Sequence, residues 1–422
     1  MATNRNFSNM LNEYVTNKML KTELLKRDYI LMNVEKDDSW KGGTIPVPFR
    51  GNQATQISFG SLPDHTASQG IHKNKYVRGQ ITDYVELWGT MAFDQRDLYD
   101  HSGRITEDSF LKVLPDQLED FMDYMKCATS VNLGSGPHFA TVTAEASAAS
   151  GIFTVDKIDR FELGMEVVLD DDNSVPQTCF VTAIDVSNDL VTLTIDATDR
   201  FGGAAANLSA YAIANAAKFF HPGSQSTSFT SIRSALLSSA NGGSATLHGQ
   251  TKLAYPHLQA VNIDGSSITP ANILDKLFDG YVNVRKRARG NAKTIMCSFG
   301  HLGAIMKLIE TQKGGFKVTA GQRNASEYGW DEIEIGSIKG SLKVVAIQEW
   351  DNDIIAYIDW SAMKFMSNGM FRKRVAPDGK SFYEIRATTG YQYLVDFSLF
   401  GEMMYTKPAN CGILHSIPST GF

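Results

Sequence analysis

The sequence predicts an α+β fold, and three observations predict it. Ile105–Leu133 has the apolar spacing of one long helix, with extended, glycine-punctuated chain on both sides. Residues 138–222 contain short strands separated by turn residues, at the spacing of a small β-barrel or sandwich. Residues 268–310 follow the order helix, strand, helix, which is typical of an α+β domain.

The N-terminal segment, residues 7–27, places apolar side chains at mixed helical spacing and predicts an amphipathic helix. Leu11 and Tyr14 belong to its apolar positions and are candidate subunit-interface residues. The charges of this segment are of both signs, whereas membrane-surface helices are strongly basic. The pattern therefore favours an arm that packs on a partner or bridges subunits over a membrane-binding helix.

Residues 41–90 lose the helical period and predict a long two-stranded hairpin with a loose tip near Pro63–Lys75. Two prolines alternate with apolar residues in the first strand and confine it to an edge or an unpaired extension. An isolated hairpin is only marginally stable in water, so we expect another chain to cover it. The candidate interface residues of this segment are Ile45, Val47, Phe49, Phe59, Tyr76 and Trp88.

The long helix carries a stripe of apolar residues in its second part, which we expect to begin with Pro115. Acidic residues in the next turn favour the positive end of the helix dipole. Taken alone, the segment is more typical of an ordinary core helix than of a spine. The residues of the stripe are Leu114, Leu118, Phe121, Met122 and Met125.

Residues 138–222 form an acidic module. They contain twelve Asp and Glu against four Lys and Arg, a net charge of −8, so the rest of a chain with net charge −6 is close to +2. We predict strands at Glu166–Leu169, Cys179–Ile184 and Val191–Ile195. The run Asp170–Asn173 lacks the ligand alternation, central Gly and terminal Glu of a calcium loop, which favours a solvated turn.

Residues 224–310 predict further helices. A short helix is expected at Ser231–Ser239, and a longer one is expected to begin at Thr269, with Pro270 in its first turn. Its inward residues are expected to be Ile273, Leu274, Leu277, Phe278, Tyr281 and Val282. The basic end of this helix complements its dipole, and a nucleic-acid contact is the alternative. Residues 293–299 predict a buried strand, followed by a helix in which His301 is a cap or core residue.

The C-terminal stretch predicts four strands. They are Lys343–Ile347, Ile354–Ile358, Tyr383–Thr388 and Gly390–Val395.

Several function classes find no support in the sequence. It lacks a GxSxG, HExxH, Walker or Rossmann pattern, so no catalytic, cofactor-binding or metal-ligating residues are predicted. The four cysteines are scattered, without metal-ligand spacing, and are expected to be buried thiols. No apolar run reaches the length of a bilayer-spanning helix and no signal peptide is evident, so we expect a soluble protein made in a cytoplasm.

The C-terminal motifs of this sequence resemble those of a known protein family. A strand with "VVA" precedes "AYIDWS", which introduces a strand with a charged "RKR" hairpin, and "YLVDFSLFGEMMYTKPANCGIL" follows near the end. This order resembles the C-terminal part of tailed-bacteriophage major capsid proteins of the Hong Kong 97-like fold. The resemblance extends over nearly the whole chain as an order of elements with loose motifs.

The resemblance implies a division of the chain. Residues 1–40 would be the N-terminal arm, 41–90 the extended hairpin loop, and 91–137 with 342–422 the peripheral domain with the spine helix. Residues 138–222 would be an inserted all-β domain, and 223–341 the axial domain.

The resemblance also implies a function and partners. The function would be self-assembly, through pentamers and hexamers, into an icosahedral shell around double-stranded DNA, which the inner surface would contact without sequence specificity. A portal protein would be a partner. The long charged leader of members with fused scaffolding is not evident, so a separate scaffolding protein is implied. The expected location is the virion capsid, assembled in the host cytoplasm, with no membrane partner.

Some members of this family cross-link neighbouring chains through Lys and Asn with the help of a Glu. Lys73 and Lys75 lie near the proposed tip, but no Asn or Glu of this sequence matches the motif, so this chemistry is not predicted. Three alternatives stay open: a tail-tube or decoration protein, a hydrolase with scattered catalytic groups, and a nucleic-acid-binding protein. The long helix disfavours the first, and the pI near 5.9 disfavours the last.

Overall fold

The computed structural model describes a set of ranges in two units. The described residues are 22, 24–41, 43–52, 75–82, 84–94, 107–147, 150–171, 175–195, 208, 217–287, 292–312, 332–337, 340–374, 383–387 and 390–418. Unit 1 draws on Met1–Met32, Val85–Ser231 and Gly369–Phe400, and unit 2 on Asn33–Tyr84, Ile232–Asn368 and Gly401–Phe422. The mixture of helices and sheets confirms the predicted α+β class.

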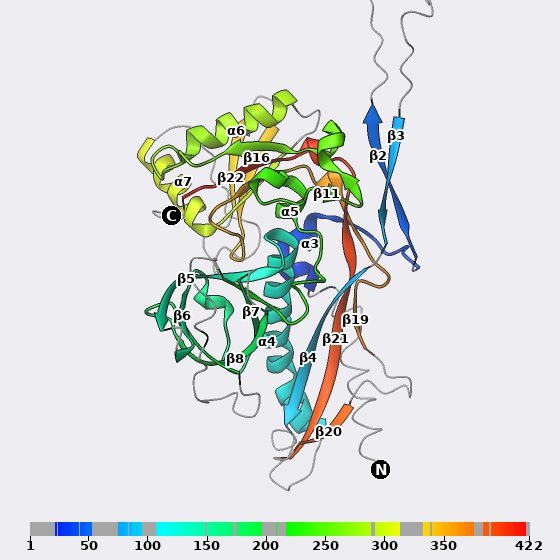
Figure 1. Ribbon diagram of the computed structural model, residues 1–422, viewed down its shortest axis with the longest axis vertical. Coiled ribbons are helices and arrows are strands. Elements are labelled where there is room, and N and C mark those ends of the chain that lie inside the picture. The colour runs from blue at the N-terminus through cyan, green and yellow to red at the C-terminus, as the bar shows by residue number, and fades with distance from the viewer. Residues whose placement is uncertain are drawn as a thin grey trace, which may run out of the picture. The chain divides into compact units, whose positions relative to one another are not determined.

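Unit 1 is built along the helix α4, Glu107–Gly134, which confirms the predicted long helix (Figure 1). The helix is continuous, so the expectation that its second part begins with Pro115 at a helix N-terminus is wrong. Met122 and Met125 of the predicted stripe are buried. Strand β4, Val85–Asp94, approaches α4 closely at Gly89, where a Cβ atom would clash with Phe121 and Met125. The free energy gained by burying this helix face exceeds the cost of the one backbone hydrogen bond that a proline removes, so the helix continues through Pro115.

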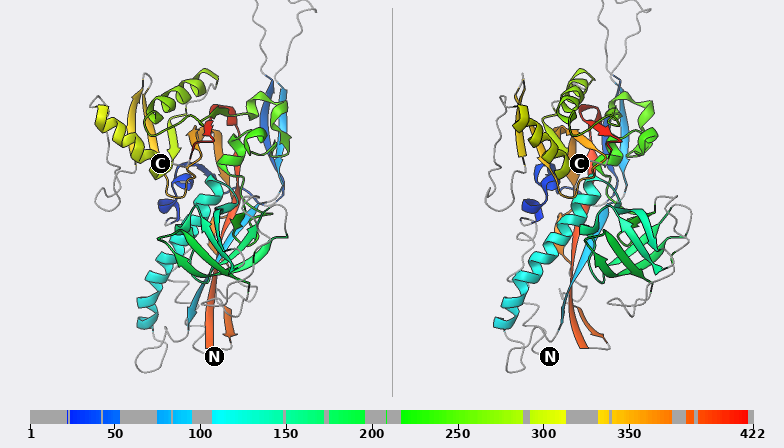
Figure 2. Two further views of the ribbon diagram at one scale, coloured as in Figure 1. Left: turned by 60° about the vertical axis from the view of Figure 1, so that its left-hand side comes forward. Right: turned by 90° about the vertical axis from the view of Figure 1, so that its left-hand side faces the viewer.

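The strand β21, Gly390–Tyr405, belongs to a six-stranded sheet, in which it pairs with β4, β19 (Phe371–Lys373) and β20 (Tyr383–Ala387) of unit 1. Figure 2 shows α4 running along this sheet. Rings of Phe121 and Phe397, 5.0 Å apart, join the helix to β21. The predicted end of this strand at Val395 is wrong, since pairing with further strands continues it for ten residues.

The acidic module is a closed barrel, which confirms the predicted inserted all-β element. Its strands are β5 (His138–Ser147), β6 (Ile152–Val155), β7 (Glu166–Asp170), β8 (Gln177–Asp185), β9 (Leu190–Thr194) and β10 (Lys218–Phe220). They close in the order β10-β5-β6-β9-β8-β7. Strands β7, β8 and β9 are the three predicted ones. Aromatic rings fill the interior, with Phe161 lying 5.1 Å from both Phe139 and Phe219.

Unit 2 contains a second six-stranded sheet, in the order β13-β22-β17-β14-β16-β15. Its strands are β13 (Val261–Asp264), β14 (Thr294–Cys297), β15 (Glu332–Ser337), β16 (Gly340–Ala346), β17 (Ile355–Ile358) and β22 (Gly412–His415). The pairs β13–β22 and β14–β16 are parallel. The domain boundary predicted between residues 341 and 342 falls inside β16.

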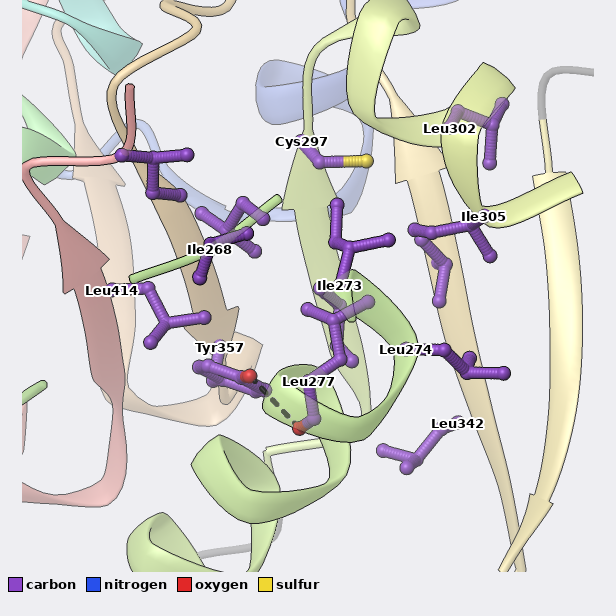
Figure 3. Close-up of a cluster of buried hydrophobic side chains, with 14 of the residues drawn as sticks. Ile268, Ile273, Leu274, Leu277, Cys297, Leu302, Ile305, Leu342, Tyr357 and Leu414 are labelled. Carbon is purple, nitrogen blue, oxygen red and sulfur yellow. Dashed lines mark hydrogen bonds between the residues drawn. The ribbon is translucent and has the colours of Figure 1, made fainter. Parts of the chain in front are cut away.

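Helices α6 (Ile273–Arg287) and α7 (Phe299–Gln312) pack on this sheet. Figure 3 shows the apolar cluster between them, where the Tyr357 hydroxyl donates to the Leu277 carbonyl at 2.9 Å. Burial of Tyr357 in this cluster raises its pKa well above the usual range. His301 is fully buried, with Nδ1 3.1 Å from the Ser298 hydroxyl, which confirms a core histidine.

The start of α6 differs from its prediction. The helix begins at Ile273, and its first backbone hydrogen bond runs from the N–H of Lys276 to the Asn272 carbonyl. The Asn272 side chain accepts the N–H of Thr269, which lies before the helix. The expected N-cap role of Thr269 is therefore wrong. Val282 is 44% exposed rather than inward, and Val284 is buried instead.

Several short helices and strands are also present, besides 3-10 turns. They are α3 (Tyr29–Asn33), β1 (Glu35–Asp37), α5 (Ile232–Leu236), β11 (Thr246–Leu247), β12 (Gln250–Thr251) and β18 (Met363–Met366). Strand β18 pairs in parallel with β1 and antiparallel with the last residues of β21. Helix α5 lies within the predicted Ser231–Ser239.

Candidate subunit-interface site

Strands β2 (Ile45–Asn52) and β3 (Lys75–Ile81) form the two-stranded antiparallel hairpin that the sequence predicts (Figure 1). Trp88 does not belong to it, because β4 is a separate strand that pairs with β21. The prediction of one hairpin through residue 90 is therefore wrong at its second strand. The interface candidates Leu11, Tyr14 and Phe59, and most of the expected tip, lie outside the described residues.

The inner face of the hairpin packs on its own chain. Val47 and Phe49 are 0% and 1% exposed, and Ile45 packs partly buried beside them. The cluster they join contains Trp40, Ile81, Leu258, Met366 and Met404, all within unit 2. The prediction that Val47 and Phe49 find their burial on a neighbouring subunit is wrong, since the same side chains cannot be covered twice.

His248 holds this inner face in place. Its imidazole stacks with the rings of both Phe49 and Tyr405. Its Nε2 accepts the N–H of Tyr405 at 3.1 Å, and its carbonyl accepts the N–H of Gln80 at 2.9 Å. Burial lowers the pKa of His248 to about 4, so the ring is neutral near pH 7 and can accept this bond.

The outer face of the hairpin has an open groove of about 360 Å³, lined by Pro46, Pro48, Tyr76 and Arg78 together with Val77, which also packs against the inner cluster. We call this surface the hairpin groove. Tyr76 is 68% exposed, and its place at a subunit interface stays a prediction. Neither proline can donate a hydrogen bond, so the free edge of β2 is a poor template for another strand.

Trp88 is the other exposed candidate, at 61% exposure on β4. Successive side chains of a strand point to opposite faces, so Trp88 and Thr90 face away from α4 while Gly89 faces it. The hydroxyl of Thr90 donates to Asp396 at 2.7 Å, which ties β4 to β21 beside this tryptophan.

The described residues offer little that suits other kinds of site. Among them, no group of three or more His, Cys, Asp and Glu side chains has the arrangement of a metal site. Within the same ranges, none of the helices has the length and apolar character needed to cross a bilayer. Burial raises the pKa of Cys179, Cys297 and Cys411 to about 12, which makes them unreactive thiols.

Sequence reasoning found the hairpin but missed which face is covered. The alternation of prolines with Ile45, Val47 and Phe49 was the available signal, because residues that share a strand face share an environment. His248 gave no signal, since its partners lie far away in the chain and contacts of that range follow from the tertiary fold alone.

Comparison with solved structures gives similar chains among capsid and phage structures. The cyanophage A-1(L) capsid asymmetric unit is 11% identical, with 90% of this chain and 89% of that chain covered and a TM-score of 0.43. The capsid of a native GTA particle is 10% identical over 92% and 90% of the two chains, with a TM-score of 0.44. Mycobacterium phage Che8 gives 9% identity over 93% and 92%, with a TM-score of 0.41. No protein-family model and no curated protein matches the chain.

Proposed function

We propose that this chain is a major capsid protein of the Hong Kong 97-like type, which self-assembles into an icosahedral shell around double-stranded DNA. The observation that carries the proposal is the hairpin, whose inner face is fixed to its own core while its outer face leaves an apolar groove uncovered. An exposed apolar surface of this kind is typical of a contact with another protein.

The order of elements supports the same function. The hairpin β2–β3, the long helix α4, the closed barrel and the sheet with α6 and α7 follow one another as the sequence resemblance implies. A contact in which the hairpin of one copy lies on a different surface of the next is heterologous, and such contacts close into rings of five and six. The chain then acts through its surfaces and needs no catalytic group.

The partners follow from the same proposal. They are other copies of the chain, a separate scaffolding protein, a portal protein and packaged DNA, with assembly in the host cytoplasm and a final location in the virion capsid. The acidic barrel faces outward in this arrangement, because its charges would repel the phosphates of packed DNA.

The test is expression of the chain with and without the scaffolding protein, followed by electron microscopy of the soluble fraction. Closed shells, pentamers or hexamers support the proposal. A monodisperse monomer under both conditions contradicts it, and a tail-tube protein would give open tubes instead of shells.

A further inference from the structure

The hairpin groove combines apolar lining residues with positive charge. Arg78 is the basic residue of its lining, and none of the lining residues is acidic. Residues 41–81 as a whole contain five Lys and Arg and one Asp, a net charge of +4. A surface that fits this groove therefore needs exposed apolar side chains beside negative charges.

One end of the barrel has this character. The N–H of Val155 donates to the Asp189 carbonyl at 2.9 Å, which brings the segment after β6 beside the β8–β9 turn. The N–H of Gly164 donates to the Val181 carbonyl at 2.8 Å and places the start of β7 at the same end. The exposed residues here, which we call the acidic rim, are Asp156, Asp159, Glu162, Leu163, Asp185, Val186 and Asp189.

The acidic rim matches the groove in both respects. Its apolar members Leu163 and Val186 are 58% and 71% exposed. Residues 156–163 contain two basic residues, and Arg160 adds no charge at the surface, because it is 7% exposed and its guanidinium donates to the Phe139 carbonyl. Lys157 is then set against three acidic residues of this segment, Asp156, Asp159 and Glu162. The Asn188 amide donates to Asp185 at 2.7 Å and lowers the pKa of that carboxyl, which keeps it ionised.

We propose that the hairpin groove of one copy docks on the acidic rim of a second copy of this chain. The inference rests on the proposed function and adds to it the identity of the receiving surface. Tyr76 and the two prolines of the groove meet Leu163 and Val186, while Arg78 meets Glu162 and its acidic neighbours. The barrel then serves to capture a neighbouring hairpin during assembly.

The test uses two charge reversals in the full chain, Arg78→Glu and Glu162→Lys. Both side chains are exposed, so the isolated subunits should keep the wild-type melting temperature. Each variant alone should raise the protein concentration needed for shell formation about tenfold, because an attraction becomes a repulsion at every contact. Lys286→Glu, an exposed charge reversal on α6, is the matched control and should assemble as the wild type does.

Mixing the two variants shows whether the groove docks on another chain or on its own chain. In an alternating ring of six, the glutamate introduced by Arg78→Glu in one copy meets the lysine introduced by Glu162→Lys in the next, and the remaining contacts pair a wild-type groove with a wild-type rim. A ring of five cannot alternate and keeps one repulsive contact, so a 1:1 mixture should recover most of the assembly that each variant alone loses. Recovery fails if the groove docks within its own chain, and that result overturns the proposal. Single variants that assemble like the wild type also overturn it.

A second measurement does not depend on assembly yield. Tyr76→Cys and Leu163→Cys chains, mixed and oxidised in assembled particles, should give a disulfide-linked dimer that neither variant gives alone. Absence of this dimer from well-formed particles contradicts the docking and leaves the shell function intact. If the wild-type chain forms no shells, the proposed function fails as well, so the two failures are distinguishable.

Discussion

The ring of Phe49 lies nearly parallel to the imidazole of His248, with centroids 6.1 Å apart and planes 11° apart. His248 also stacks with Tyr405, with centroids 6.2 Å apart. Three residues from distant parts of the sequence thus fix the inner face of the hairpin to the rest of unit 2. Because this anchoring lies within one chain, the hairpin presents its groove before any neighbour arrives.

Phe49 and Tyr76 should differ in what their truncation affects. Phe49→Ala removes a fully buried ring and should lower the free energy of unfolding of the subunit by about 3–5 kcal/mol. Tyr76→Ala removes an exposed ring and should change it by less than about 0.5 kcal/mol while weakening assembly. Denaturant unfolding and shell yield measure the two effects. Loss of subunit stability on Tyr76→Ala would contradict the assignment of this residue to an uncovered face.

Gly79 should resist substitution. A Cβ atom at this position would clash with the Phe49 ring and approach the His248 carbonyl, so Gly79→Ala should destabilise the subunit by about 1–3 kcal/mol. Gly303 in α7 has no neighbour within 4 Å of such an atom and is the matched control. Gly303→Ala should stabilise the helix by about 0.5–1 kcal/mol. Thermal melting of both variants tests the pair.

His248 should make the stability of unit 2 depend on pH. Its pKa is lowered from 6.5 to about 4 in the folded chain, so between these values the unfolded chain binds a proton that the folded chain does not. Stability should therefore fall as pH decreases from 6.5 to 4, by on the order of 2 kcal/mol. The backbone of His248 has a φ of 48°, a left-handed value that Asn also tolerates, so His248→Asn removes the titrating ring without straining the turn.

Comparison of unfolding curves for the wild type and His248→Asn isolates this effect. The difference between the two free energies should shrink as pH falls, because the variant lacks the titrating ring. His221, whose pKa burial also lowers to about 4, contributes equally to both proteins and cancels in the difference. A difference that stays constant between pH 6.5 and 4 would show that the ring is not held neutral.

The ion pairs of Arg233 should contribute more to the free energy of unfolding than an exposed ion pair does. Its guanidinium donates to both oxygens of Asp353 at 2.9 and 2.6 Å and to Asp351 at 3.1 Å. Lysine cannot reproduce this fork, so Arg233→Lys should cost about 1–3 kcal/mol of unfolding free energy. Glu35→Gln breaks the more exposed pair with Lys364 and should cost less than about 1 kcal/mol. Equal losses in denaturant unfolding would contradict the distinction.

Local pattern predicted much of the fold. The long helix, the β7–β9 strands, β14 and α7 follow from apolar periodicity and turn residues, which act over a few neighbouring positions. Strand β5 is missed because its Ala, Thr and Ser residues weaken the period-two contrast, and β6 and β10 are missed because four and three residues are too few to show an alternation. Strand β21 was cut short at Val395 because its continuation is stabilised by pairing with β18 and β19.

The candidate site is harder to predict, because residues far away in the sequence determine which face of the β2–β3 hairpin is buried. The sequence identifies Val47 and Phe49 as apolar strand residues but does not reveal Leu258, Met366 and Met404, which cover them. Tyr76 was assigned to the interface on the same grounds and is exposed. The difference between these residues is one of strand face, which becomes visible once the core that receives the hairpin is known.

The central claim, that another chain covers the outer face of the hairpin, is tested most directly by hydroxyl-radical footprinting of Tyr76. Reactivity is compared between isolated subunits and purified shells, with the buried Tyr405 as an internal reference. The account predicts that Tyr76 reacts readily in the subunit and becomes protected in the shell. Tyr76 that stays as reactive in the shell as in the subunit would contradict it.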